Sequence, residues 1–436
     1  MRLPDSVSQC LQALEGADYP CYCVGGCVRD AVLGLIPHDY DLCSAATPAQ
    51  MKAVFAHRQL VLAGEKHGTV GVVTDEGIVE ITTFRTESGY EDNRHPDRVE
   101  FVTDITQDLA RRDFTVNAMA WSPLRGFADP YGGRADLERG ILRAVGNPAT
   151  RFQEDSLRIL RGVRFAVRYH LSPDPETEKA MGEQAFLMDN LARERVFEEL
   201  CKLLPLVNAG DLLRFAPILA QVIPELAPTQ GFDQHSRHHA YDVFTHTAYV
   251  MEAVPAELPL RWAALLHDIG KVPTFTRDAA GQGHFLGHAG IGAAMADTVL
   301  RRLKAPTALR EQVVLLIELH MTKIEPEKKV IRRWLSRLGE ETLRMLLLLQ
   351  QADMAGKSPE YGESSHFSRV LALIDEITVE NACLTVRDLA VNGHDLMAQG
   401  LTGKDIGTTL NALLALVLDE KVENEKSALL AAIQHR

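Results

Sequence analysis

Five residues near the start of the chain have types and spacing that suit phosphate chemistry. Two adjacent glycines let backbone N–H groups approach a phosphate chain, and the helix that follows adds its positive end. An arginine on the first turn of that helix can bind a phosphate oxygen. Two aspartates one residue apart on a strand share a face, where a divalent cation relieves their repulsion. These residues, in CVGGCVRDAVLGLIPHDYDLCS, are Gly25, Gly26, Arg29, Asp39 and Asp41. Their order predicts a nucleoside triphosphate and Mg2+ held beside a nucleophile, unless a glycine turn and a DxD strand end follow each other by chance.

A second group of residues has the types that bind metals. His267 and Asp268 end the apolar segment LRWAALLHDIGK, and further histidines and an aspartate lie on neighbouring helical segments. Histidine and carboxylate ligands drawn from several helices suit one or two divalent ions, either Mg2+ or a transition metal. The predicted ligands are His246, His267, Asp268, His288, His320 and Asp353, with His238 and His239 as alternatives to His246.

A third pattern could read a nucleotide base. In EDSLRILRGVR (154–164), Asp155 and Arg158 are three residues apart, so on one helix they share a face. An aspartate accepts from an exocyclic amine, and an arginine donates to a ring nitrogen or carbonyl. Such a pair would accept cytosine and adenine and reject uracil and guanine. The alternative is a surface ion pair, which contributes little to stability. Arg161 and Arg164 are assigned to the same nucleotide site, and Arg168 to no role.

Composition limits the class of protein. The chain has 436 residues, so several domains are expected, and its net charge of -13 argues weakly against a nucleic-acid-binding surface spread over the whole molecule. The sequence contains no apolar run long enough to span a bilayer and no export signal at its start. Its seven cysteines form no CxxC pair. These features predict a cytoplasmic protein with reduced thiols and no membrane association.

The elements that must position these residues divide the chain in two. Strands are predicted at 79–86 and 98–105, and a helix at 47–55 opens with a capping box. Glu80, on the first of these strands, is either a third metal carboxylate or an exposed strand residue. A helix is predicted at 154–170, and from about residue 141 onward the pattern is helical throughout. We therefore expect a mixed α/β head followed by an all-α remainder.

The order GGxVRDxxLG followed by DxD resembles the head of the polymerase-β-like nucleotidyltransferases. More narrowly, it is similar to the bacterial class II tRNA nucleotidyltransferase and poly(A) polymerase family. Three later segments match that family in order: DLARRDFTVNAMA with Arg111, Arg112 and Asp113; EDSLRILRGVR with Glu154, Asp155, Arg158, Arg161 and Arg164; and RERVFEELCK with Arg195, Glu199 and Lys202. The last three residues are more simply interpreted as a row of salt bridges along one helix. The order of histidines and aspartates over 236–356 resembles the HD phosphohydrolase superfamily.

The resemblance implies Mg2+-dependent addition of CCA to the tRNA 3′ end, from CTP and then ATP, without a template. It implies that Asp39 and Asp41 hold the catalytic ions, that the glycines and arginines of the head hold the triphosphate, and that Asp155 and Arg158 choose the base. The implied divisions are a nucleotidyltransferase head (1–140), a neck and body (141–235), an HD domain (236–360) and a helical tail (361–436). The body and tail would bind the acceptor arm of tRNA, with the basic segment 327–338 either contributing or forming a solvated face. No obligatory protein partner is evident.

Three alternatives remain open. An enzyme that adds only A, or a poly(A) polymerase, would share all four head motifs. The loop at 87–97 has ordinary length, which disfavours an enzyme that adds only CC. The HD domain could be the active part, as a phosphohydrolase acting on RNA 3′ ends, with the head binding RNA. A non-enzymatic RNA-binding protein would leave both groups of metal-binding residues unexplained.

Overall fold

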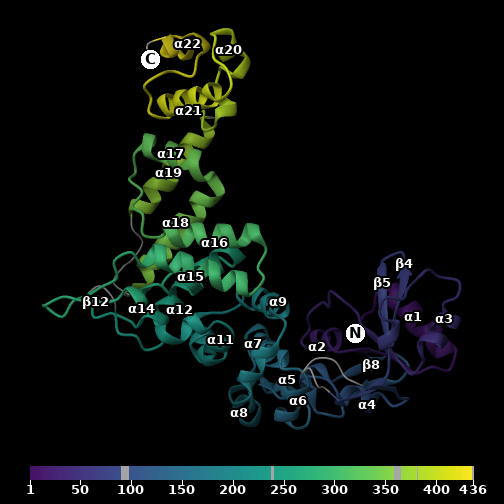
Figure 1. Cartoon of the computed structure of the whole chain (residues 1–436). Helices are drawn as coiled ribbons and strands as arrows, with labels where there is room; N and C mark the ends of the chain where they lie inside the picture. Colours follow the sequence, from purple (N-terminus) through teal and green to yellow (C-terminus); the bar gives the residue numbers. More distant parts are fainter. Residues whose placement is uncertain (90–97, 237–239, 358–364, 381, 435–436) are drawn as a thin grey trace. The chain divides into compact units, whose positions relative to one another are not determined.

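The computed structural model describes residues 1–89, 98–236, 240–357, 365–380 and 382–434 (Figure 1). These residues form two compact units, of which the first comprises Met1–Leu206 and Arg214–Pro224. The second unit comprises Val207–Leu213 and Glu225–Arg436. The finer division into four domains stays a prediction. Most of the predicted loop at 87–97 lies outside the described residues. The alternative ligands His238 and His239 also lie outside them.

The first unit contains a seven-stranded mixed sheet. Its strand order is β3-β4-β5-β2-β1-β8-β9, and within it β2 and β5 are parallel whereas every other neighbouring pair is antiparallel. The strands are β1 (Cys21–Val24), β2 (Leu42–Ser44), β3 (Leu60–Val61), β4 (Thr69–Thr74), β5 (Gly77–Thr83), β8 (Ala120–Ser122) and β9 (Gly126–Ala128). Two smaller pairs are β6 (Arg85–Ser88) with β7 (Arg98–Phe101), and β10 (Ile141–Leu142) with β11 (Ser172–Pro173).

Helices complete the first unit. They are α1 (Asp5–Gly16), α2 (Gly26–Val32), α3 (Pro48–Val54), α4 (Ile105–Ala110), α5 (Gly133–Glu138), α6 (Pro148–Glu154), α7 (Leu157–Arg168), α8 (Pro175–Glu183), α9 (Arg193–Leu203) and α11 (Ala216–Val222); α10 (Ala209–Arg214) lies where the chain passes between the units. The predicted helix at 47–55 is confirmed, because α3 starts at a capping box formed by Thr47 and Gln50.

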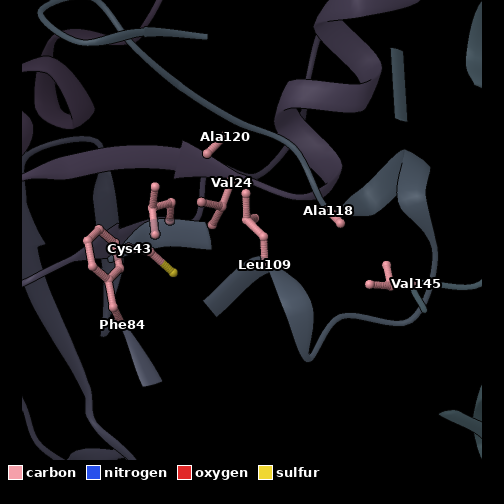
Figure 2. Packing of buried hydrophobic residues seen from close by; sticks show 8 residues of the cluster. Val24, Cys43, Phe84, Leu109, Ala118, Ala120 and Val145 are labelled. Carbon is pink, nitrogen blue, oxygen red and sulfur yellow. The ribbon is translucent and has the colours of Figure 1, made fainter. Parts of the chain in front are cut away.

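A buried apolar cluster fixes the strands that border the phosphate-binding turn. Figure 2 shows Leu109 of α4 pointing toward Val24 of β1, with Cys43 of β2 and Phe84 close by. Phe84 is completely buried, and it separates β5 from β6. The strand predicted at 79–86 is therefore broken into two.

The strand predicted at 98–105 is wrong in its second half. Strand β7 ends at Phe101, and α4 begins at Ile105. Asp104 caps that helix, since its carboxylate accepts a hydrogen bond from the backbone N–H of Thr106 at 2.9 Å.

The second unit is helical apart from one short hairpin. Its elements are α12 (Val243–Ala253), α13 (Leu258–Leu266), α14 (Lys271–Thr274), β12 (Thr276–Arg277), β13 (Gly283–His284), α15 (His288–Arg302), α16 (Thr307–Leu319), α17 (Lys328–Leu338), α18 (Glu340–Lys357), α19 (Ser365–Val379), α20 (Gly393–Ala398), α21 (Lys404–Leu418) and α22 (Lys426–Gln434). Helix α12 packs on α13 and α18, and α16 packs on α13, α15 and α18 (Figure 1). The predicted α/β head and helical remainder are thus confirmed.

The basic segment 327–338 forms α17, and several of its cations pair with acids of neighbouring elements; its contribution to tRNA binding stays a prediction. On α17, Lys328 pairs with Glu376 at 2.8 Å, Arg332 with Glu420, and Arg333 with Asp419. These cations join α17 to α19 and to the segment that follows α21, so they hold the tail together. Within the described residues, no helix is both long and apolar enough to cross a membrane.

Candidate functional site

One cavity in the first unit brings together nearly all of the predicted head residues. We call it the head cleft; its volume is about 790 Å³ and its lining is mainly polar. It is lined by Gly25, Gly26, Arg29, Asp39, Asp41, Arg111, Arg112, Asp113, Asn117, Asp155, Arg158, Arg161, Arg164, Phe165 and Lys202. Glu154 is the one predicted nucleotide-site residue outside this lining. Seven of the lining side chains are cationic and four are acidic, in a chain whose net charge is -13. The cleft therefore attracts an anion although the protein as a whole is acidic.

The glycine turn has a conformation that only glycine adopts easily. Gly25 has φ 70° and ψ -125° and caps the N-terminus of α2. A Cβ atom at this position would lie 2.7 Å from Nη1 of Arg112. The turn therefore lets the backbone approach an arginine of the cleft.

The two aspartates precede a strand instead of lying on it. Asp39 and Asp41 come before β2, although the carbonyl of Asp41 accepts a hydrogen bond from Val24 N–H at 3.0 Å. The two carboxylates also line a second cavity together with Glu80 of β5. Desolvation raises the pKa of Asp41, Arg112 opposes this effect, and the charges of Glu80 and Asp39 raise the pKa further. Three carboxylates that line one cavity, two of which raise the pKa of the third, form a set that a divalent cation would stabilise.

Arg29 is held by protein groups on all sides. Its guanidinium donates to Oδ1 of Asn117 at 2.5 Å and to Oδ1 of Asp30 at 2.7 Å, and also to the hydroxyl of Tyr169. Its central carbon lies 4.1 Å from the centre of the Tyr169 ring. Arg29 lines the cleft but is 6% exposed, so a phosphate would have to displace one of these partners.

A buried carboxylate organises the two adjacent arginines. Asp108 is completely buried; its Oδ1 accepts from Arg111 at 2.9 Å and its Oδ2 accepts from Arg112 at 3.4 Å. Arg111 also pairs with Glu87 at 3.0 Å, which satisfies most of its donors. Sequence reasoning missed Asp108, although it opens the DLARRDFT segment that carries both arginines.

The predicted helix at 154–170 is interrupted at its start. Helix α6 ends at Glu154, Asp155 is extended with φ -144° and ψ 102°, and α7 begins at Leu157. The carboxylate of Asp155 accepts a hydrogen bond from Leu157 N–H at 3.1 Å, as a capping residue does. The argument that Asp155 and Arg158 share a helix face is therefore wrong.

Asp155 and Arg158 line the same cleft but do not pair with each other. Asp155 pairs with Arg195 of α9 at 3.0 Å. Arg158 pairs with Glu154 at 2.6 Å and donates to the carbonyl of Arg111 at 2.9 Å. Both side chains are thus fixed by different neighbours.

Further along α7, the arginines pair with acids from other elements. Arg161 donates to Oδ2 of Asp113 at 2.6 Å. Burial would raise the pKa of Asp113, but the charge of Arg161 and a hydrogen bond from Asn117 lower it to about 2. Arg164 pairs with Glu199 of α9. The carboxylates neutralise these guanidiniums until a ligand competes for them.

The predicted row of salt bridges along α9 is wrong. Arg195 and Glu199 pair with Asp155 and Arg164, which belong to the segment from α6 to α7. Lys202 is exposed, lines the cleft and has no ion-pair partner among the described residues. It is therefore a cation that is free to bind an anionic ligand.

In the second unit, the six predicted metal ligands form two groups that share Asp268. The first group is His246, His267, Asp268 and Asp353, and the second is Asp268, His288 and His320; within each, the ligand atoms lie within 4.8 Å of one another and every residue is buried. Nε2 of His246 lies 3.0 Å from Asp353 Oδ1 and 3.4 Å from Asp268 Oδ2. We call these residues the histidine cluster.

The ring orientations of the histidine cluster suit a metal. Nδ1 of His267, His288 and His320 lies 2.9, 2.8 and 2.6 Å from a backbone carbonyl three residues earlier. A carbonyl can only accept, so each Nδ1 carries the proton and each Nε2 points inward as a ligand. Burial lowers the pKa of His288, and lowers that of His320 to about 4, so both rings are neutral. Their Nε2 lone pairs face each other at 3.3 Å, which is favourable only with a cation between or beside them.

Cations of the protein occupy the carboxylates of the histidine cluster. Lys271 lies 2.6 Å from Asp268 Oδ2, and Lys357 lies 3.0 Å from Asp353 Oδ2. Burial lowers the pKa of His267, but Asp268 and Asp353 outweigh this effect and raise it to about 9. A proton on His267 thus takes the place of an ion, and metal binding would release it.

Comparisons with known proteins agree with the head motifs. A family described as the poly A polymerase head domain matches residues 21–143. An RNA- and SrmB-binding site of polymerase A matches residues 170–229, and a tRNA nucleotidyltransferase domain 2 matches residues 275–433.

Full-length relatives extend this match to the whole chain. The CCA-adding enzyme of Streptococcus thermophilus is 31% identical over 430 residues, covering 97% of this chain and 95% of the relative. The CCA-adding enzyme of Lactiplantibacillus plantarum is 43% identical over 219 residues, which cover 48% of this chain and 53% of the relative. The crystal structure of the Bacillus stearothermophilus CCA-adding enzyme in complex with CTP is 27% identical, with a TM-score of 0.76 and coverage of 100% of this chain and 98% of that one. The family predicted from the motifs is confirmed: this chain belongs to the CCA-adding enzymes with a class II, poly(A)-polymerase-type head.

Proposed function

We propose that this chain adds C, C and A to the 3′ end of tRNA, using CTP and then ATP without a nucleic-acid template. The observation that carries the proposal is the head cleft, which combines the Asp39–Asp41 pair, the glycine turn and seven cations in one cavity. Membership of the CCA-adding enzyme family supports it. Since the substrate would be tRNA, we also propose a cytoplasmic location. We expect no obligatory protein partner.

The acids and the cations of the cleft have different proposed roles. Asp39 and Asp41, with Glu80 beside them, would hold Mg2+, and the bound ion would supply activation of a hydroxyl nucleophile and neutralisation of a triphosphate. The 3′-hydroxyl oxygen of tRNA forms a bond to the α-phosphorus of the bound nucleotide. The bond from that phosphorus to its bridging oxygen breaks, pyrophosphate leaves with the electron pair, and the hydroxyl proton passes to water. Arg112 and Lys202, which line the cleft, would hold the triphosphate against the glycine turn.

Base selection is assigned to Asp155 and Arg158, each held by its own partner. Asp155 keeps its orientation through Arg195, and Arg158 through Glu154 and a backbone carbonyl. A carboxylate and a guanidinium that line the same cleft would accept the amino group and neighbouring acceptor that cytosine and adenine share. Uracil and guanine would place a carbonyl against the carboxylate.

Three tRNA transcripts distinguish CCA addition from its alternatives. The transcripts lack CCA, end in C, or end in CC, and each is incubated with Mg2+ and one or more labelled nucleotides. Addition of C, C and one A to the shortest transcript is expected. Addition of A only to the CC-ended transcript would indicate an A-adding enzyme, and long A tails a poly(A) polymerase. No incorporation by folded protein would contradict the proposal and leave the head as an RNA-binding module.

A second function is favoured by the histidine cluster. We propose that this cluster binds one or two divalent ions and hydrolyses phosphate esters at RNA 3′ ends. Four buried histidines favour a transition metal over Mg2+. A bound ion would supply an activated water. Asp268, which belongs to both groups, would bridge two ions, and Lys271 would neutralise it when they are absent. Elemental analysis of purified protein tests this proposal, with one or two ions per chain expected and none contradicting it.

A further inference from the structure

An aromatic ring lies among the cations of the head cleft. Among the described residues that line this cavity, Phe165 of α7 is the only aromatic one, and it is 5% exposed. The central carbons of Arg164, Arg29 and Arg161 lie 4.5, 5.3 and 5.4 Å from the centre of its ring. All three arginines also line the cleft. One ring therefore contacts three cations from two helices, α2 and α7, that are far apart in the sequence.

A second ring lies one helical turn further along. Tyr169 follows α7 directly, and its ring centre lies 6.2 Å from that of Phe165. The same ring lies 4.1 Å from the central carbon of Arg29, which therefore contacts both rings. Phe114, which is completely buried, meets Phe165 edge-on with 5.9 Å between the ring centres, and this contact ties Phe165 to the core. We call Phe165 and Tyr169 the aromatic pair.

The contacts with the aromatic pair differ in kind from the hydrogen bonds of the same arginines. A cation within about 6 Å of a ring centre is attracted to the negative π face, whichever acceptors take its N–H groups. Those N–H groups are now taken by acids: Arg161 donates to Asp113 at 2.6 Å, and Arg164 pairs with Glu199. A triphosphate that replaced the carboxylates would take over the donors, while the attraction to the ring would remain.

The three guanidiniums would repel one another if their carboxylate partners were displaced. Each lies within 5.4 Å of the same ring centre, so loss of the carboxylates would leave three positive charges close together. Attraction to a ring face opposes this repulsion, and it is stronger where water is excluded, as at the buried ring of Phe165. A polyphosphate, which carries several negative charges close together, is the anion that would fit among these cations.

We infer that the aromatic pair positions Arg29, Arg161 and Arg164 for the triphosphate of the bound nucleotide. Phe165 and Tyr169 are positioning residues, because they touch the arginines and the arginines bind the phosphate oxygens. This inference rests on the nucleotidyl transfer proposed above, and it adds the arginines of α7 to the cations that hold the triphosphate. Since CTP and ATP carry the same triphosphate, the two rings affect both nucleotides alike, in contrast with the residues assigned to base selection.

Fluorinated phenylalanines test this role without removing the ring. Each fluorine withdraws charge from the π face and changes the size of the side chain little. Phe165 is replaced in the full-length protein by phenylalanine that carries one, two or three fluorines, and KM and kcat for CTP and ATP are measured on tRNA transcripts. We expect KM for both nucleotides to rise with each fluorine, to about tenfold with three, because three cation contacts weaken together. The value of kcat should stay within about twofold of wild type, and Tm should not change.

Two further sets of variants sharpen the test. The same replacements at Phe186, a 57% exposed ring in the short helix Ala185–Asn190, are the matched control and should leave KM unchanged. Tyr169→Leu should raise KM for both nucleotides, and Tyr169→Phe, which keeps the ring but loses the hydroxyl bonded to Arg29, should restore most of the loss. Calorimetric binding of inorganic tripolyphosphate, which has no base, should weaken with fluorination of Phe165 by the same factor as binding of CTP.

Binding and transfer, measured separately, distinguish this inference from the function on which it rests. CCA addition with a KM that fluorination of Phe165 does not change would overturn the role of the aromatic pair and leave the proposed function, and a lower Tm at constant KM would assign the ring to packing alone. Binding of CTP and tripolyphosphate that weakens with each fluorine, in a protein that adds no nucleotide to any transcript, would overturn the proposed function and keep the aromatic pair. Absence of addition together with binding that fluorination does not change would overturn both.

Discussion

In the head cleft, guanidinium groups are paired with acids from other elements, whereas in the histidine cluster the ligand atoms face one another across short distances. Arg161 and Arg164 have carboxylate partners in Asp113 and Glu199. Nε2 of His246 instead lies 3.3 Å from Nε2 of His267. The cleft can stay assembled without its ligand, because most of its arginines already have acidic partners in the protein. The cluster keeps its geometry through backbone carbonyls and requires a proton or an ion to relieve repulsion.

This difference predicts that a substitution in one region impairs the activity of that region alone. Substitution of Asp39 and Asp41 by alanine should reduce nucleotide addition at least about a thousandfold, since charge stabilisation by a bound ion contributes several kcal/mol to a transition state. Single-nucleotide resolution of the tRNA products measures the loss. Asp75→Ala, at an exposed acid between β4 and β5, is the control. If the double variant added nucleotides at the wild-type rate, the assignment of Asp39 and Asp41 as metal ligands would be wrong.

Inside the histidine cluster, the shared ligand should matter more than an unshared one. Asp268→Ala should weaken binding of both ions at least about a hundredfold, because it removes a carboxylate from each group. His288→Ala should affect only the second ion. Elemental analysis after dialysis gives the stoichiometry, and CCA addition should persist in both variants. Asp278→Ala, an exposed aspartate paired with His284, is the control. Equal losses in the two cluster variants would contradict the two-ion arrangement.

A smaller effect is expected where α9 supports base selection. Arg195→Ala removes the partner that orients Asp155, so the preference for CTP over UTP should fall about tenfold, a typical cost of losing a charged hydrogen bond. Separate kcat and KM values for each nucleotide measure this change. Arg193→Ala is a matched control on the same helix, because among the described residues Arg193 donates only to the carbonyl of Asp189. An unchanged preference would show that Asp155 does not depend on α9.

The smallest expected effect concerns stability. The pKa of Asp41 is raised in the folded protein, so its ionised form opposes folding at neutral pH. Asp41→Asn should therefore raise the free energy of unfolding at pH 7 by less than about 1 kcal/mol, since the carboxylate is in contact with water. The gain should shrink as the pH falls through the unfolded-state pKa of aspartate, about 3.9, because the carboxylate then becomes protonated in both states. Urea titrations at pH 7 and at pH 3.5 test the sign; a loss of stability at pH 7 would contradict it.

Residue types and order were sufficient to predict which side chains gather at each site. The head cleft contains the predicted residues apart from Glu154, and all six predicted ligands meet in the histidine cluster. Their roles stay predictions. Periodicity could not locate the break at Asp155, because the segments on both sides of it are helical and only the capping bond of Asp155 separates α6 from α7. The ion-pair partners could not be predicted either, because the spacing of Arg195, Glu199 and Lys202 does not indicate that the partners of Arg195 and Glu199 lie on another segment.

The two ion pairs between the segment 155–164 and α9 have a mechanical consequence. Asp155–Arg195 lies just before α7, and Arg164–Glu199 lies about two turns further along it, so α7 is braced to α9 at two separate points. A helix fastened at two points cannot slide or rotate against its neighbour without breaking one fastening. Any movement that changes the cleft from accepting CTP to accepting ATP must therefore move α7 and α9 together, as one rigid body.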